Sequence, residues 1–391
     1  MRPSVLALGF LACTFACADE NGDGEGGSAE TVGSEAEASG DVDAGCTEGT
    51  LGCSCFPNGT CFDDLVCDAG VCGDGDGDGD GDGDGDGDGD GDGDGDGDGD
   101  ADVVPPFTLE CESGLDPVIL VDPISGQGTR YPNLTLAAMV APPGATIELC
   151  AGTYADDVTF FSGVTLRGEG RDKTFIEGGH IRVAIFQEFT LRDLTFRNCS
   201  STRGGAVIFE DANGVDEKLT IFQVDFLDNE ASTKGGAVEI GDQSTDDSLP
   251  TSQIERTNFI GNRVLDDAGC GGGLLANGEV HIEDSTFENN VARCGGGLHI
   301  AYGCSAENPC TLRDSRVVAN SAMSDPSLSF SGGGAIHLFE GLYFEARNVD
   351  FGTANSPDDI TAVVDSSTKN SFGPFGDAAD VDCMSGSCSA L

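Results

Sequence analysis

Apolar and polar residues alternate in short runs between about residue 190 and residue 351, and these runs recur. Each round contains an alternating segment that ends in Phe, an Asn three residues later, a variable loop, and then Gly-Gly-(Ala/Gly) followed by apolar residues. The alternating segments are FTLRDLTF (189–196), LTIFQVDF (219–226), SQIERTNF (252–259), VHIEDSTF (280–287) and TLRDSRV (311–317). This period of two predicts β-strands in every round.

The last residues of these segments define one column of the repeat. Gaps of about 28 to 34 residues separate its members, which is the range of stacked repeats. Turn signals of the Asn-Gly kind do not join the segments, so the strands are not hairpins. Each round buries its apolar side only against the next, as a coil of two or three short strands that climbs by about 4.8 Å would do. The sequence therefore predicts an all-β solenoid, a parallel β-helix, with a column formed by Phe196, Phe226, Phe259, Phe287, Val317 and Phe351.

Two residue types recur at the predicted corners of the coil. Asn follows the Phe strand, where it tolerates a left-handed backbone, and its stacked amides are expected to hydrogen-bond from coil to coil. Paired glycines suit a sharp bend at which a Cβ atom would clash with the coil above. The asparagines are Asn229, Asn262, Asn290 and Asn320, and the glycine pairs are Gly204-Gly205, Gly235-Gly236, Gly271-Gly272, Gly295-Gly296 and Gly333-Gly334.

The FxxN and GGA(I/V/L) motifs together resemble the polymorphic outer-membrane protein repeat over about residues 189–351. The resemblance implies a right-handed parallel β-helix of the pectin-lyase-like class. The first round departs from the motif, because FRNCS places Asn198 one position early and Cys199 where Asn is expected. Upstream, LTLAAMVAPPGATIELCAGTY (134–154) resembles the opening of pectin-lyase-like β-helices, which implies a short helix that caps the open end of the core.

Composition divides the rest of the chain into segments. Residues 1–17 combine one Arg, a short apolar run and a small residue before cysteine, which predicts an export signal. Ala16-Cys17 resembles a bacterial lipoprotein cleavage site and implies a lipid on Cys17; Cys13 is a rival site, and an ordinary signal peptide is the alternative. There follow an acidic tether too poor in apolar residues to fold (18–45), a Cys-rich module (46–72), a Gly-Asp linker (73–102) and the β-helix (103–391).

The lipoprotein resemblance also implies a location. Neither candidate cysteine is followed by Asp, which implies the outer membrane, with the protein facing either the cell surface or the periplasm. Membrane contact is then expected through the N-terminal lipid alone, and the protein is extracellular if lipidation fails. We expect a monomer.

The cysteines predict disulfides, because an exported protein meets an oxidising environment. Six lie in the small module, where they allow fifteen pairings, and a zinc site is the rival interpretation: Cys46, Cys53, Cys55, Cys61, Cys67 and Cys72. In the β-helix we expect the pairs Cys111–Cys150, Cys304–Cys310 and Cys383–Cys388. Cys270 and Cys294 precede Gly triplets on neighbouring coils, where they either form a disulfide or merely stack. Cys199 is left as a buried thiol.

The formal net charge of −52 divides into −27 for residues 1–102 and −25 for the remainder. Such a field repels nucleic acid and anionic polysaccharides such as pectate. The Gly-Asp repeat resembles the start of a calcium loop, but strict alternation puts Gly at the twelfth position, where a bidentate carboxylate is needed. An extended polyanionic spacer is therefore the simpler interpretation, with weak calcium association and no other cofactor expected.

Two histidines form the candidate metal site. Alignment of the Gly triplets places His299 and His337 in one outward-facing column on adjacent coils, with Glu239 in that column two rounds earlier. Imidazoles stacked about 5 Å apart are able to share a metal ion or titrate together. The alternative is a solvent-facing ladder without a ligand.

For function, the sequence favours a non-catalytic β-helix that acts in adhesion or binds a surface glycan or protein. An enzyme of the pectin-lyase-like class is the first alternative, and a passive envelope protein is the second. The basic residue with calcium-binding acids of the lyases is not evident, nor are the clustered Asp, His and Arg-x-Lys of the hydrolases, so we assign no catalytic residue. Three acids that converge on one concave face would favour the enzyme.

Overall fold

The computed structural model describes residues 66–68, 71–73, 107–184, 188–210, 218–241, 250–322, 331–365 and 368–391. The chain forms two units, Met1–Gly97 and Asp98–Leu391. In the first unit, β1 (Val66–Asp68) pairs with β2 (Val71–Gly73) in antiparallel fashion. The expectations for Cys13, Cys17, the tether, the Gly-Asp linker and most of the Cys-rich module lie outside the described residues. Within the described residues, no helix has the length and apolar character needed to cross a bilayer.

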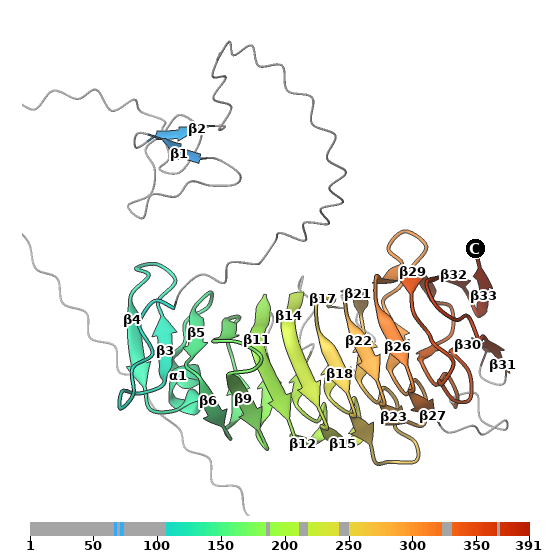
Figure 1. The fold of residues 1–391 in the computed structure, drawn as a ribbon, viewed down its shortest axis with the longest axis horizontal. Helices are drawn as coiled ribbons and strands as arrows, with labels where there is room; N and C mark the ends of the chain where they lie inside the picture. Colours follow the sequence, from blue (N-terminus) through green and yellow to red (C-terminus); the bar gives the residue numbers. More distant parts are fainter. Residues whose placement is uncertain are drawn as a thin grey trace, which may run out of the picture. The chain divides into compact units, whose positions relative to one another are not determined.

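The second unit is a right-handed parallel β-helix, in which coils stack along one axis (Figure 1). Each coil adds strands to three sheets. The first sheet contains β5 (Thr146–Leu149), β6 (Gly152–Tyr154), β8 (Thr165–Gly168), β9 (Thr174–Glu177), β11 (Phe189–Arg197), β14 (Lys218–Leu227), β17 (Thr251–Glu255), β18 (Asn258–Ile260), β21 (Glu279–Glu283), β22 (Thr286–Glu288), β25 (Cys310–Arg313), β26 (Arg316–Val318) and β29 (Tyr343–Val349).

The second sheet is short and the third runs nearly the length of the unit. The second contains β12 (Ser200–Arg203), β15 (Glu230–Lys234), β19 (Arg263–Val264), β23 (Val291–Ala292) and β27 (Ser321–Ala322). The third contains β7 (Asp157–Phe160), β10 (His180–Val183), β13 (Val207–Phe209), β16 (Val238–Ile240), β20 (Leu274–Asn277), β24 (Leu298–Tyr302), β28 (Ile336–Leu338), β30 (Ile360–Asp365) and the antiparallel β31 (Thr368–Phe372).

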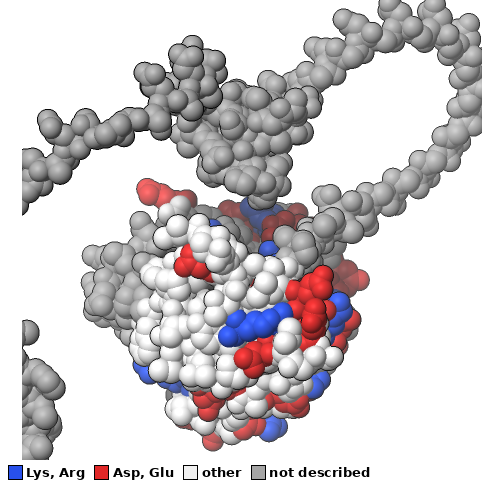
Figure 2. All heavy atoms as spheres, turned by 90° about the vertical axis from the view of Figure 1, so that its left-hand side faces the viewer, with Lys and Arg blue, Asp and Glu red and all other residues white. Residues whose placement is uncertain are grey.

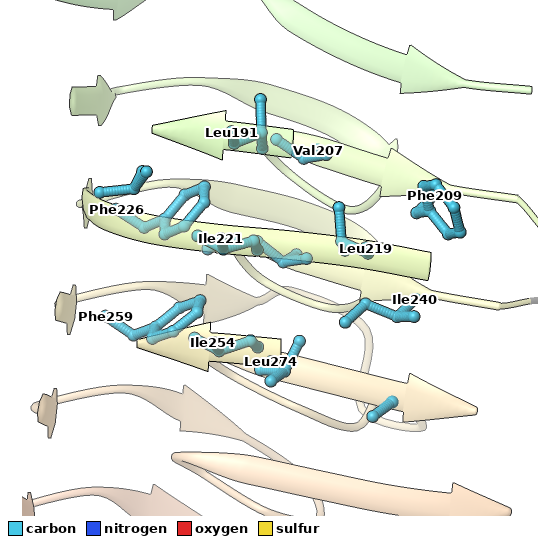
Figure 3. Close-up of a cluster of buried hydrophobic side chains, with 14 of the residues drawn as sticks. Leu191, Val207, Phe209, Leu219, Ile221, Phe226, Ile240, Ile254, Phe259 and Leu274 are labelled. Atoms are coloured by element: carbon cyan, nitrogen blue, oxygen red, sulfur yellow. The ribbon is translucent and has the colours of Figure 1, made fainter. Parts of the chain in front are cut away.

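The predicted Phe column forms a stack inside the first sheet. Phe196 pairs with Phe226, Phe226 with Phe259 and Phe259 with Phe287 in parallel register. Their ring centroids lie 5.2, 4.9 and 4.6 Å apart in nearly parallel planes. Aliphatic side chains stack beside them in the same way, as Figure 3 shows for Leu191, Ile221 and Ile254. Because like residues contact like residues on the next coil, one continuous core runs through the unit.

The predicted asparagines form a buried ladder, which we call the asparagine ladder. Nδ2 of each donates to Oδ1 of the next, over 3.0 Å from Asn229 to Asn262, 3.0 Å from Asn262 to Asn290 and 2.9 Å from Asn290 to Asn320. The same Oδ1 atoms accept the backbone N–H of the preceding asparagine. The buried thiol Cys199 occupies the first position of the ladder, since its N–H donates to Asn229 Oδ1.

One detail of the corner prediction is wrong. The left-handed backbone belongs to the residue before each asparagine, and the asparagines themselves have ordinary φ. Each asparagine turns inward and is fully buried, so its side chain replaces the strand partners that the corner lacks. Residues with positive φ form three columns along the β-helix. One bends the strands of the first sheet, one lies at the corner just before the asparagines, and one begins the glycine corner. The three columns are Asp193, Gln223, Arg256, Asp284, Asp314 and Asn348; Asn198, Asp228, Gly261, Asn289 and Ala319; and Gly204, Gly235, Gly271, Gly295 and Gly333.

The glycine corner is tight for a second reason. A Cβ atom on Gly236 would lie 2.0 Å from the carbonyl oxygen of Gly272 on the next coil. The first glycine of the pair therefore supplies the left-handed turn, and the second allows the backbones to approach.

Both ends of the core are covered. At the N-terminal end lies the expected helix, α1 (Leu134–Val140), which Asn133 caps by accepting a hydrogen bond from the N–H of Leu136. Beside it, β3 (Val118–Val121) pairs in antiparallel fashion with β4 (Gly128–Tyr131) and β5. Figure 2 views this end and shows that uncharged residues cover much of it. At the other end β29 pairs in antiparallel fashion with β32 (Ala379–Met384), which pairs with β33 (Ser387–Ala390).

Four disulfides staple the β-helix. Cys111–Cys150 and Cys383–Cys388 lie near its two ends, and Cys304–Cys310 closes the loop between β24 and β25. Cys270–Cys294 joins two neighbouring coils, which decides between the disulfide and the simple stacking that the sequence left open.

The asparagine ladder predicts a large effect of a small truncation. Asn290→Ala removes the acceptor for the Asn262 N–H and the donor to the Phe259 carbonyl, two buried groups of the preceding coil. We expect a loss of about 2–4 kcal/mol in the free energy of unfolding, because buried polar groups lose their partners. Urea unfolding of the full chain measures it. The matched control is Asn289→Gly: Asn289 is exposed with φ +56°, which glycine accommodates, so its change should stay within about 0.5 kcal/mol. Equal effects of the two variants would contradict the role of the ladder.

Candidate functional site

A groove of about 520 Å³ lies on the outer face of the first sheet, over β17, β21, β25 and β29. Ile254 and Ile282 point into the core from this sheet, so the residues on either side of them point outward. The groove is lined by five glutamates and by other polar residues, among them Gln253, Glu255, Glu279, His281, Glu283, Glu307, Asn308, Thr311, Arg313 and Glu345.

Parallel register arranges these side chains in two rows across the coils. One row runs from Gln253 through His281 and Thr311 to Glu345. The neighbouring row carries Glu255, Glu283, Arg313 and Arg347. Neighbouring strands lie about 4.8 Å apart, so each row presents hydrogen-bonding groups at a regular spacing.

His281 lies at the centre of the first row and is held on both sides. Its Nε2 lies 2.8 Å from Glu279 Oε1, and its Nδ1 lies 3.0 Å from Thr311 Oγ1 on the next coil. The His281 side chain is 35 % exposed, so it is oriented by its partners but open to the groove. A histidine between a carboxylate and a hydroxyl is able to bind a polar ligand or to move a proton.

The loop between β24 and β25 forms one wall of the groove. It contributes Glu307, Asn308 and Pro309. The Cys304–Cys310 disulfide closes its base, and Ser305 and Asn308 exchange hydrogen bonds, the Ser305 N–H donating to the Asn308 carbonyl and the Asn308 N–H to the Ser305 hydroxyl. The wall is therefore fixed without a ligand.

The groove is strongly acidic. Arg313 is the one arginine or lysine among the residues that line it, against five glutamates. The field repels anionic polymers and favours neutral or positively charged ligands, in agreement with the charge argument from the sequence.

The sequence analysis missed this site. Its residues lie about 30 positions apart along the chain, and none forms a local motif. The signal was present in the alternating segments: aligned on the Phe column, SQIERTNF, VHIEDSTF and TLRDSRV place Gln253, His281 and Thr311 in one column and Glu255, Glu283 and Arg313 in another.

The predicted histidine column exists on the third sheet. His299 on β24 pairs with His337 on β28, their ring centroids lie 4.9 Å apart, and their Nδ1 atoms lie 3.0 Å apart. Glu239 occupies the same column two coils earlier, beyond Leu275.

The prediction that this column faces solvent is wrong. His299 is 6 % exposed, and His337 and Glu239 are fully buried, although they point away from the apolar core. Burial, and next the neighbouring His337, lower the pKa of His299 well below its usual value, so the imidazole is neutral at pH 7. The pair is thus a buried contact and not a surface ladder. The disulfide Cys270–Cys294 lies beside it, with both Sγ atoms and a His299 ring nitrogen within 4.8 Å of one another.

Glu239 is buried with an ionic partner. Arg203 Nε lies 3.1 and 3.0 Å from its two carboxylate oxygens, and Arg203 Nη2 lies 2.6 Å from Oε1. Burial raises the pKa of Glu239, and the hydrogen bonds from Arg203 oppose that rise. Arg203 therefore offsets the free-energy cost of burying the Glu239 carboxylate in this column.

Comparison with known proteins adds two distant likenesses. No family model matches the chain, and no curated protein matches it. Among solved structures, a pectin methylesterase from Yersinia enterocolitica is similar over 62 % of this chain and 87 % of its own, with 14 % identity and a TM-score of 0.34. The PL6 family alginate lyase AlyGC is similar over 58 % of this chain and 38 % of its own, with 15 % identity and a TM-score of 0.24. The resemblance to polymorphic outer-membrane protein repeats remains one of sequence motifs.

The Arg203–Glu239 pair predicts a pH-dependent loss of stability. Arg203→Met leaves the Glu239 carboxylate buried without its cation, so its pKa rises further. The pKa of an unperturbed Glu in the unfolded chain is about 4.3. A higher pKa in the folded state lowers the free energy of unfolding at pH values above about 4.3, and this loss disappears as the pH falls below that value. We expect Arg203→Met to lower the free energy of unfolding by about 2–3 kcal/mol at pH 7, less than the roughly 3–5 kcal/mol of fully buried pairs because Arg203 is 35 % exposed. This deficit should shrink towards pH 4.

Urea unfolding of wild type and variant at several pH values measures this deficit. Arg263→Met is the control, because the Arg263–Glu230 pair is exposed and should contribute less than about 1 kcal/mol. A deficit of Arg203→Met that stays constant between pH 7 and pH 4 would show that lost packing, and not the buried charge, is its cause.

Proposed function

We propose that this protein is an exported, lipid-anchored β-helix protein of the bacterial cell envelope that binds a glycan chain in the groove of the first sheet. The observation that carries the proposal is the pair of polar rows across β17, β21, β25 and β29, with His281 fixed between Glu279 and Thr311. Carboxylates, an amide, an imidazole and a guanidinium in regular rows supply the hydrogen bonds by which sugar hydroxyls are recognised.

The charge of the groove selects the ligand class. Five glutamates against Arg313 disfavour uronic acids and sulfated sugars, which carry negative charge. Neutral sugars and sugars with a free amine suit the groove, the amine by pairing with carboxylates. Beyond the groove the second row continues to Phe222, whose ring is flanked by Arg192 and Arg256 at 5.3 and 5.6 Å from its centroid.

Hydrolysis of the bound glycan is a second candidate function. Its supporting observation is the convergence of Glu255, Glu283 and Glu345 on the concave face beside His281. Glycoside hydrolysis uses two carboxyl groups that flank the scissile bond, one as acid and one as base or nucleophile. This convergence is the feature that was expected to favour an enzyme, so cleavage and binding are tested together.

The test is a glycan array and a polysaccharide-depolymerisation screen on the full chain, with and without calcium. We expect binding of a neutral or amine-bearing glycan, and an affinity at least tenfold lower, about 1.4 kcal/mol, in Glu283→Gln and in Arg313→Ala. Glu288→Gln is the matched control, since Glu288 also lies on the first sheet but outside the groove, where it pairs with Arg316.

The outcomes separate the candidates. Binding without product supports recognition alone. Product release that Glu255→Gln or Glu345→Gln abolishes, while binding is retained, makes the protein a hydrolase. Binding that is equal in wild type, Glu283→Gln and Arg313→Ala would exclude the groove, and no ligand on any screen would leave the passive envelope protein.

A further inference from the structure

The four residues Cys270, Cys294, His299 and His337 lie together beside the third sheet, away from the groove. Cys270 and Cys294 are partners in a parallel bridge between neighbouring coils, just before the glycine corner. Their Sγ atoms and a ring nitrogen of His299 all lie within 4.8 Å of one another. His337 extends the set through its Nδ1, 3.0 Å from His299 Nδ1.

Two thiols and two imidazoles are the ligand set of a tetrahedral zinc site. Zinc holds cysteine sulfur at about 2.3 Å and histidine nitrogen at about 2.0–2.1 Å, so the ligand atoms of such a site lie roughly 3.3–3.8 Å apart. The two Nδ1 atoms lie 3.0 Å apart, and both sulfurs lie within 4.8 Å of a His299 ring nitrogen, while the two sulfurs are bonded to each other. In the dithiol state the two sulfurs are no longer bonded, and rotation of the side chains is the movement that brings the four ligand atoms to these separations.

Burial also suits a metal ion. Cys294 and His337 are fully buried and His299 nearly so. A divalent ion with two thiolates and two neutral imidazoles has no net charge, so the complex can be enclosed without a counter-ion. The ligands come from three neighbouring coils, with Cys294 and His299 on the middle one, and the parallel register of β24 and β28 holds the two histidines side by side.

We propose that Cys270, Cys294, His299 and His337 form a Cys2His2 site for zinc or a similar borderline metal ion in the dithiol state of the protein, and that the Cys270–Cys294 disulfide is the metal-free state. In the reductive step an external dithiol reduces the disulfide and is itself oxidised to a disulfide, which leaves two cysteine thiols. Zinc then displaces one proton from each thiol. An external disulfide then accepts two electrons from the two thiolates and is reduced to two thiols by thiol–disulfide exchange, which restores the Cys270–Cys294 bond, removes two ligands and releases the ion.

The experiment measures zinc bound to the full chain after reduction and removal of excess reductant under anaerobic conditions. The six cysteines of residues 46–72 are replaced by Ser throughout, so that they contribute no thiolates. We expect one zinc ion per chain that is absent from His299→Asn/His337→Asn and from Cys270→Ser/Cys294→Ser. Cobalt in place of zinc should give the d–d bands of a tetrahedral ion together with a thiolate charge-transfer band.

Two controls isolate the site. His281→Asn, a histidine in the groove, and Cys304→Ser/Cys310→Ser, a disulfide elsewhere, should both retain the metal. Circular dichroism checks that each variant is folded. A second measurement needs only the parent chain: oxidation of the zinc-bound protein with diamide should release the zinc to a chromogenic indicator. Equal zinc in the parent chain and the double histidine variant, or zinc that stays bound after oxidation, would overturn the proposal. Glycan binding by the groove does not enter either result.

Discussion

Hydrogen bonding from coil to coil is the interaction on which the rest of this structure depends. A coil of about 30 residues cannot satisfy its own backbone, because its N–H and C=O groups point along the axis towards its neighbours. In the strands the neighbouring coil supplies partners through parallel pairing. At the corner after the Phe strand, where the strand ends, asparagine side chains take over: Asn262 Oδ1 accepts both the backbone N–H and the side-chain amide of Asn229. A shift of register would break the strands and the asparagine ladder together.

Strict register also places equivalent residues of successive coils side by side on the surface. Positions one coil apart become neighbours, so outward residues form rows as inward residues form stacks. The groove arises where these rows carry Glu, His, Thr and Arg, and where a disulfide-closed loop rises beside them. Its chemistry belongs to no single coil. His281 is oriented by Glu279 of its own strand and by Thr311 of the next, so the site exists only in the stacked molecule.

The same register gives a different environment on the third sheet. Glu239, His299 and His337 also point away from the core, yet they are enclosed. In the groove a carboxylate keeps contact with water, whereas Glu239 requires Arg203 to remain ionised. Burial lowers the pKa of His299 well below its usual value, so this imidazole is neutral and lies beside the Cys270–Cys294 disulfide. Side chains that point away from the core therefore form a surface row where they stay exposed, as in the groove, and a buried cluster where they are covered, as on the third sheet.

The resemblance of residues 134–154 to the opening of other β-helices implied the capping helix, and the sequence by itself determined the parallel β-helix, the Phe and asparagine columns and the glycine corners. These features depend on periodicity and on residue types that suit one backbone conformation, and both can be recognised without coordinates. The left-handed corner residue was assigned one position late, because Asn is favoured both at such positions and as a buried bridging amide, and only the fold shows which applies at Asn229. Tertiary structure alone decided that Cys270 and Cys294 bond, that the histidine column is buried and that five glutamates share a groove. The physical reason is that bond formation, burial and convergence depend on distances between coils and on the loops that cover them, and neither is encoded within a single repeat.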